Sequence, residues 1–132
     1  MPIKLTNHPK LRTIRFVANG VLTAEDLDKA NVEGKAMSDS YEGRKHMVLA
    51  DMRGLKTVDA KNAARLGELI SYQRSHGVFL CVHISDETIT RLQMGRLSRQ
   101  AQANDAVTVD VVSLEEGEKV LSEARMKLRT EE

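Results

Sequence analysis

The segment HMVLADMRGLKTVDAKNAARLGELISYQRSHGVFLCVHI, residues 46–84, determines the predicted fold. Its two ends, His46–Asp51 and Val78–Ile84, are nearly continuous apolar runs, which are typical of strands buried on both faces. Between them, apolar residues recur at helical spacing from Asp59 to about Ser75, and Gly77 provides a stop signal. A strand, a helix and a strand in this order predict a parallel pair within an α/β sheet. The predicted inward stripe of the helix is Ala63, Leu66, Gly67 and Ile70, with Lys61, Arg65, Glu68 and Arg74 facing away.

The residues before this segment predict a β-hairpin followed by a helix. Apolar and polar residues alternate within Leu11–Thr23, and Asn19-Gly20 is a dipeptide typical of tight hairpin turns. Thr23 is the expected N-cap of the helix, with Asp26 three residues later as in a capping box. This helix is expected to run from Ala24 to about Met37.

The residues after the segment predict a helix, a strand and a last helix. The first of these helices is expected over residues 87–103, and the strand over the alternating run Val107–Val112. Ser113–Glu116 has the pattern of a capping box, which begins a helix through about Leu128.

This order of elements predicts a single α/β domain over residues 1–132. The sheet is expected to be mixed, mostly parallel, with an antiparallel N-terminal hairpin. The outer strands have a polar face, formed by Thr13 and Arg15 in one and by Thr108 and Asp110 in the other. We therefore expect the helices to pack mainly on one face of the sheet.

Composition restricts the classes of function. Hydrophobic residues make up 41% and charged residues 30% of the 132 positions, as in ordinary globular domains. Aromatic residues are only 3%, which disfavours base stacking on single-stranded nucleic acid, and residues 105–132 carry eight acidic against four basic side chains. With one cysteine and no long apolar segment, the sequence predicts a cytoplasmic protein that binds neither nucleic acid nor membrane.

Two pairs of residues are candidates for chemistry. Asp51 and Asp59 follow a central strand and precede the next helix, where open α/β sheets place acid/base or magnesium sites. The alternative is structural: Asp59 caps the helix and Asp51 pairs with a local base. Cys81 and His83 share one face of a strand, as a thiol–imidazole pair or half a metal site requires, but a buried cysteine is the favoured interpretation.

A third candidate is the basic helix with Arg91, Arg96 and Arg99, which is a potential phosphate-binding surface. It lacks interleaved aromatic residues, so a solvated helix face is the favoured interpretation. No catalytic residue, cofactor or metal is expected.

Residues 46–85 resemble the central segment of the STAS domain family, named for sulfate transporters and anti-sigma factor antagonists. The order of the other elements is also similar, above all to the single-domain SpoIIAA-like bacterial proteins. The matching positions are Leu49 and Asp51 at the strand end, Gly54 in the loop, the pair Val58-Asp59, and Gly77 after the helix.

The sequence departs from the family at the regulatory position. Where the resemblance places a phosphorylated serine this chain has Ala60, and the next two family positions, Ser and Gly, are Lys61 and Asn62. Alanine has no hydroxyl to accept phosphate, so the family's phospho-switch is not expected here.

The resemblance implies a non-enzymatic regulatory protein–protein interaction module of bacterial signalling. The implied partner is a kinase-like anti-sigma factor or another STAS chain. Independently of the resemblance, the open sheet face and apolar edges make a homodimer an expected possibility, because a partner chain often covers such surfaces. The expected partner-binding residues surround the start of the central helix: Thr57, Asp59, Ala60, Lys61, Asn62 and Arg65.

Two other functions are weighed against this one. The STAS fold resembles lipid-binding CRAL-TRIO domains, so a small apolar-ligand or lipid carrier is the alternative, with a pocket beside Met47, Phe79 and Cys81. An enzyme that uses Asp51, Asp59 or His83 is the least supported.

Overall fold

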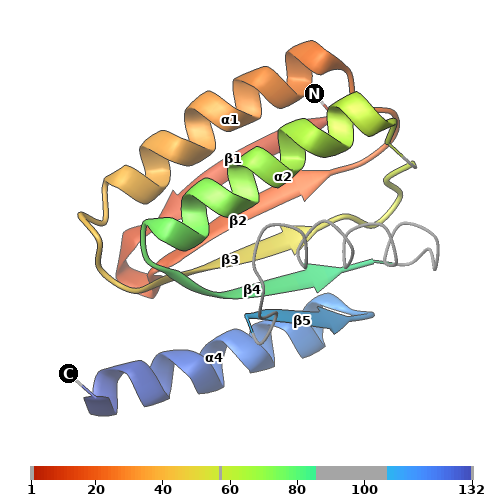
Figure 1. Ribbon diagram of the computed structural model, residues 1–132. Coiled ribbons are helices and arrows are strands. Elements are labelled where there is room, and N and C mark those ends of the chain that lie inside the picture. Colours follow the sequence, from red (N-terminus) through yellow and green to blue (C-terminus); the bar gives the residue numbers. More distant parts are fainter. Residues whose placement is uncertain (1, 57, 86–106, 132) are drawn as a thin grey trace.

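The computed structural model describes residues 2–56, 58–85 and 107–131 (Figure 1). These residues form a five-stranded sheet in which the strands are ordered as in the chain. The strands are β1 (Ile3–His8), β2 (Thr13–Ala18), β3 (His46–Asp51), β4 (Val78–Ile84) and β5 (Thr108–Val111). The α-helices are α1 (Ala24–Asp39), α2 (Ala60–Ser75) and α4 (Leu114–Glu131), and a 3-10 turn, η1 (Pro9–Leu11), follows β1. The predicted helix over 87–103, with its three arginines, lies outside the described residues.

The sheet is mixed, as predicted. β1 pairs with β2 antiparallel, whereas β2–β3, β3–β4 and β4–β5 are parallel. The carboxyl ends of the parallel strands therefore share one edge of the sheet, to which the loop that opens α2 belongs (Figure 1). The α/β class and the N-terminal antiparallel pair are confirmed.

The position of the hairpin differs from the prediction. The antiparallel partners are β1 and β2, joined by η1 and Arg12, and Asn19-Gly20 is not their turn. Gly20 does have a positive φ of 68°, but the chain continues there into α1 and forms a parallel bridge with Leu55. The dipeptide thus predicted the backbone conformation and not the partner strand.

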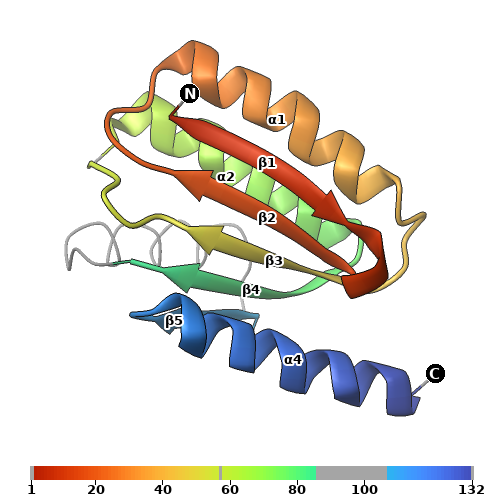
Figure 2. The ribbon, with the colours of Figure 1, turned by 180° about the vertical axis from the view of Figure 1, so that it is seen from behind.

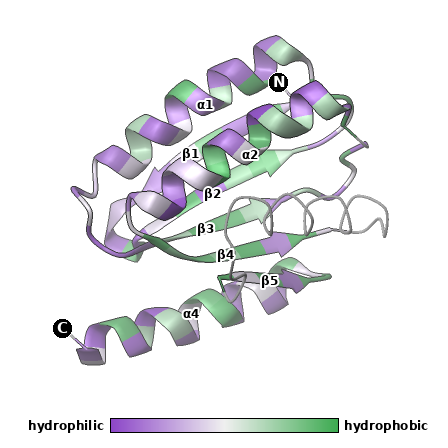
Figure 3. Ribbon diagram, in the orientation of Figure 1, coloured by the Kyte–Doolittle hydropathy of each residue, from purple (hydrophilic) through white to green (hydrophobic). Residues whose placement is uncertain are grey.

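The helices cover the two faces of the sheet unequally. α1 and α2 lie side by side over one face, and α4 crosses the other (Figures 1 and 2). In β3, Val48 and Ala50 belong to the core beneath α1 and α2, whereas Met47 and Leu49 belong to the core beneath α4. Figure 3 shows the resulting concentration of apolar residues in the central strands.

The polar face predicted for the outer strands is only partly open. α4 packs on β3, β4 and β5 and reaches β2 through an ion pair between Arg15 and Glu118. Thr13, predicted to face solvent, is only 1% exposed because Arg125 of α4 lies against it. Lys4 and Val17, farther from α4, are exposed. The helices were predicted to pack mainly on one face of the sheet. Of the described α-helices, α1 and α2 share one face, and α4 packs on the other.

The helix ends follow the predicted caps. Thr23 and Asp26 form a complete capping box, and α1 extends two residues beyond Met37 to Asp39. Asp59 is the N-cap of α2, where its carboxylate accepts the Asn62 N–H at 2.8 Å. At α4, the hydroxyl of Ser113 accepts the Glu116 N–H at 3.2 Å, which is one of the two bonds of the predicted box.

The buried face of α2 is shifted from the prediction. Leu66 is buried as expected, but Ala63, Gly67 and Ile70 are only half-buried, and a β-carbon on Gly67 would meet open space. Leu69 and Arg74 are buried instead. Arg74 was predicted to face away from the core; its guanidinium instead reaches Thr108 of β5. A long apolar stem lets an arginine lie over a sheet while its polar head finds a partner.

No helix among the described residues is long and apolar enough to cross a bilayer.

Candidate functional site

The loop before α2 is held by the loop before α1. The Gly20 N–H donates to the Gly54 carbonyl at 2.9 Å, and the Lys56 N–H donates to the Gly20 carbonyl at 2.9 Å. Leu55 and Val58 anchor the same loop in the core, at 1% and 7% exposure. The described backbone on either side of residue 57 is therefore held by two hydrogen bonds and two buried side chains.

Five exposed residues other than glycine lie on the described part of this loop and the first turn of α2. They are Arg53, Lys56, Asp59, Ala60 and Lys61, and we call them the α2 rim. Val21, which follows Gly20 in the neighbouring loop, is 72% exposed. The rim thus presents three cations, one carboxylate and a small residue beside an exposed apolar side chain.

The predicted partner-binding residues divide into two groups. Asp59, Ala60 and Lys61 are exposed members of the rim, whereas Thr57 lies outside the described residues. Asn62 is buried; its amide donates to the Leu22 carbonyl at 3.1 Å. Its side chain therefore holds α2 to the loop before α1 and does not point to solvent.

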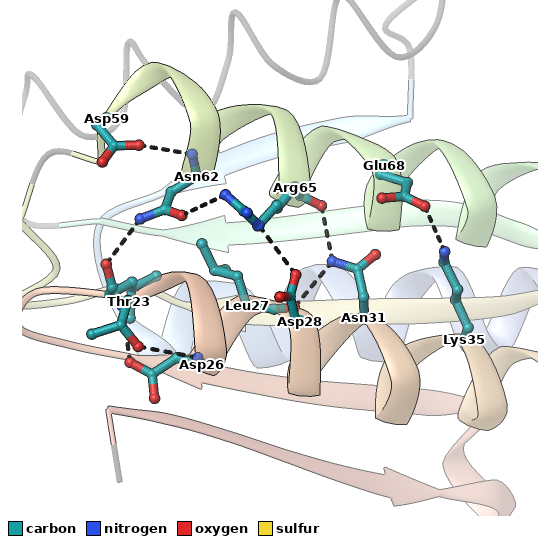
Figure 4. Close-up of polar contacts among 11 residues, drawn as sticks. Thr23, Asp26, Leu27, Asp28, Asn31, Lys35, Asp59, Asn62, Arg65 and Glu68 are labelled. Atoms are coloured by element: carbon teal, nitrogen blue, oxygen red, sulfur yellow. Dashed lines mark hydrogen bonds and ion pairs between the residues drawn. The ribbon is translucent and has the colours of Figure 1, made fainter.

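Arg65 is likewise engaged within the chain. Its Nε donates to Asp28 of α1 at 3.1 Å, and its Nη1 donates to the Asn62 side-chain oxygen at 3.2 Å (Figure 4). The buried Asn31 of α1 donates to the Arg65 carbonyl at 3.0 Å. Together with the Lys35–Glu68 pair at 2.9 Å, these contacts fasten α1 to α2. Arg65 is thus a link between the helices in this structure.

Sequence reasoning missed Arg53, Lys56 and Val21 as neighbours of the α2 start. Their proximity depends on the pairing of two loops far apart in the chain. The signal available was a glycine in each loop: Gly20 and Gly54 both have a positive φ, of 68° and 80°.

The two candidate carboxylates have structural partners. Both oxygens of Asp51 accept from the Arg53 guanidinium, at 2.9 and 2.7 Å, and these hydrogen bonds lower the pKa of Asp51. Asp59 accepts the N–H of Asn62. The geometry therefore favours the structural interpretation, a helix cap and a local ion pair, over an acid/base pair.

Cys81 and His83 lie on the same face of β4, as predicted. Both are 5% exposed and line an apolar cavity of about 40 Å³ between the sheet and α2. No group of three or more His, Cys, Asp or Glu residues in the described part of the chain is arranged to hold a metal ion. A cavity of this size accommodates about three water molecules, at about 10–15 Å³ each.

The pocket predicted for the carrier alternative is not formed by its three residues. Cys81 lies beneath α2, whereas Met47 and Phe79 lie on the opposite face of the sheet, beneath α4. A register shift between β3 and β4 near His46 moves Phe79 to that face, which a strict alternation does not anticipate. Ligand pockets usually measure about 300–1,000 Å³, so the cavity beside Cys81 is far too small for an acyl chain.

His46 is a buried polar residue at the other end of β3. Its Nδ1 lies 2.8 Å from the Arg44 carbonyl and therefore carries the hydrogen, while Nε2 accepts from the Ser38 hydroxyl at 2.9 Å. Its ring also stacks on Tyr41 at 4.2 Å. Burial lowers the pKa of His46, so the neutral ring links the end of α1 to the sheet.

The sequence matches no known family model and no protein of curated function.

Proposed function

We propose that this chain is a non-enzymatic interaction module of bacterial signalling that binds a regulatory partner protein through the α2 rim. The observation that carries the proposal is the rim itself: exposed polar residues on a backbone that two hydrogen bonds and two buried side chains hold in place. A surface that is ordered before binding loses little conformational entropy when a partner docks. The STAS resemblance supports the same location.

The charge of the rim indicates the chemistry of the partner surface. Arg53 is paired with Asp51, so the rim and Asp51 together carry three cations against two carboxylates, and an acidic surface is the better electrostatic complement. Ala60 allows close approach of a partner backbone, and Val21 offers an apolar contact beside it. A kinase-like anti-sigma factor or a second STAS chain is the proposed partner, and binding at Ala60 is independent of phosphorylation there.

A charge-reversal experiment tests the location. The variant Lys56→Glu/Lys61→Glu changes two exposed side chains of the rim. The control variant Lys119→Glu/Lys127→Glu makes the same change in net charge on exposed positions of α4. Arg65 is left unchanged, because its reversal would also break the Asp28 contact between the helices.

Partners are captured from the native cell with the wild-type protein and identified, and the purified partner is then titrated against each variant. We expect the control to bind as the wild type does and the rim variant to bind at least about tenfold more weakly, which corresponds to about 1.4 kcal/mol. Equal affinity of the rim variant and the control would rule out the rim as the docking surface. Gel filtration of the wild type and rim variant tests a second copy of the chain as the partner.

A further inference from the structure

One side of α4 carries four charged residues whose signs alternate. They follow one another at intervals of four positions and all are exposed: Lys119, Glu123, Lys127 and Glu131. Residues four apart lie on the same side of a helix, about 6 Å apart along its axis, so these side chains form one ridge. We call this ridge the α4 row. No other described helix lies beside α4 (Figure 2).

The α4 row makes little use of its charges within the chain. Opposite charges four residues apart can pair along one helix, as Lys29 and Glu33 do in α1 at 3.9 Å. In the described part of the chain, no ion pair joins two members of the α4 row. Glu131 pairs instead with Lys45 at 3.7 Å, and both side chains of that pair are more than half exposed. An exposed pair of this kind contributes little to stability, so pairing within the chain does not explain the row.

A groove with an apolar lining runs beside the α4 row. It has a volume of about 330 Å³ and lies between the second half of α4 and the start of β4. The apolar lining includes Phe79, Leu80, Val120 and Ala124, and three members of the α4 row line the groove as well. Phe79 is half-buried, and aromatic residues are enriched where proteins bind one another. The row and the groove thus form one continuous surface with an apolar part and a charged margin.

The order of charges in the α4 row is complementary to itself when the direction is reversed. The midpoint of the row is position 125, and a two-fold axis there places Glu123 opposite Lys127 of the partner subunit. The same axis places Lys119 opposite Glu131 of the partner subunit. Two helices in the same direction would instead place like charges opposite each other. The row therefore favours an antiparallel pair of α4 helices, and helices whose rows of residues four apart interdigitate cross at about 50°.

We infer that a second copy of this chain docks on α4 in antiparallel orientation, so that the two α4 rows pair and each copy covers the groove of the other. Burial of the groove residues supplies the apolar contact, and the charges set the orientation. The α2 rim lies on the other face of the sheet, at the carboxyl ends of the parallel strands, and is left open by this dimer (Figure 1). The inference therefore does not depend on the proposed function. The variant Lys119→Glu/Lys127→Glu should separate the copies and still bind the partner of the rim.

Charge reversals at the centre of the α4 row test the dimer. Glu123→Lys and Lys127→Glu each create two pairs of like charges across the axis, because position 123 of one copy faces position 127 of the other. An equimolar mixture of the two variants restores opposite charges at both places, and so does the double variant Glu123→Lys/Lys127→Glu. Neither substitution changes the pair between Lys45 and Glu131. The control is Lys61→Glu on the α2 rim, which makes the same change in charge as Lys127→Glu.

Sedimentation equilibrium of the full chain, over a range of concentrations, measures the Kd of the dimer. We expect the wild type and Lys61→Glu to form dimers with the same Kd. Each single variant of the row should raise Kd at least about tenfold, which corresponds to about 1.4 kcal/mol. The equimolar mixture and the double variant should return Kd close to the wild-type value. In about 1 M NaCl, where the Debye length is about 3 Å, the wild-type dimer should weaken.

Three results would overturn the inference. The first is a wild type that stays monomeric, which would leave the groove to a small ligand or to another protein. The second is an unchanged Kd in the single variants, or a mixture of the two that does not dimerise. The third is dissociation of the dimer by Lys61→Glu, which would assign the contact between copies to the α2 rim. Loss of partner binding in the rim variants with an intact dimer would support both surfaces separately.

Discussion

Replacement of Gly77 by alanine should destabilise the fold more than its backbone conformation alone explains. Gly77 follows α2 with a φ of +115°, and its carbonyl accepts the N–H of His46. A β-carbon at this position would lie 2.5 Å from the Arg44 carbonyl oxygen and 3.1 Å from two atoms of the His46 ring. The first contact is with backbone, so the turn or the start of β3 has to shift.

The magnitude follows from three effects. The disfavoured φ costs about 1–3 kcal/mol, and overpacking in a filled site costs about 1–3 kcal/mol. Alanine also lowers the conformational entropy of the unfolded chain, which offsets about 0.4–1 kcal/mol of this destabilisation. We therefore expect Gly77→Ala to lower the free energy of unfolding by about 1–5 kcal/mol, a large share of the about 5–15 kcal/mol typical of a domain.

Gly43→Ala is the matched control. Gly43 has a φ of +81°, but a β-carbon there would meet no atom within 4 Å. Only the conformational cost of about 1–3 kcal/mol, offset by the same about 0.4–1 kcal/mol in the unfolded chain, applies to this variant. Because the chain has no tryptophan, urea unfolding is followed by far-UV circular dichroism. If the two variants unfold with free energies within about 0.5 kcal/mol of each other, the contact with Arg44 and His46 is not what requires glycine.

Three further predictions concern stability. Gly67→Ala in α2 should stabilise the fold by about 0.5–1 kcal/mol, because the added β-carbon meets open space. Gly34→Ala in α1 should stabilise it less or destabilise it, because the β-carbon would lie 2.8 Å from the side chain of Leu69. Equal shifts of the thermal midpoint in the two variants would contradict this difference. Asp59→Ala should cost about 1 kcal/mol in urea unfolding by removing the α2 cap, and Asp59→Asn should cost much less. Burial lowers the pKa of His46 below 6.5 in the folded chain, so below about pH 6.5 the unfolded state binds more protons. As the pH is lowered below about 6.5, the free energy of unfolding should therefore decrease by at most about 1.4 kcal/mol per pH unit, until the pH reaches the pKa of His46 in the folded chain. Subtracting the pH profile of a His46→Gln variant isolates this slope, and identical profiles would refute it.

The elements that local pattern defines were predicted well. β3 and β4 follow from continuous apolar runs, and α1 and α2 begin at the caps Thr23 and Asp59. These features depend on neighbours within a few residues, where backbone sterics and capping act. β1 was missed because the turn signal at Asn19-Gly20 directed the hairpin to the wrong partner.

The arrangement of the candidate site could be predicted only in part. The spacing in α2 placed Lys61 on the surface correctly, but it also treated Asn62 and Arg65 as available to a partner. Both side chains are used between α1 and α2, and the positions opposite them, Leu22 and Asp28, lie 40 and 37 residues away in the chain. Contacts over such separations depend on how the helices pack and leave no periodic trace in the sequence.

The strand order has a consequence for how the chain is made. Every described strand pairs with the one that precedes it, so no strand has to insert between two that are already paired. As the chain emerges during synthesis, each crossover helix can settle on a sheet that has just gained one strand, with short-range contacts formed before long-range ones. Among the described elements, α4 alone covers β3 and β4 on the far face, and it follows β5 in the chain. No described element therefore protects the apolar residues Met47, Leu49 and Val82 on that face until α4 has formed.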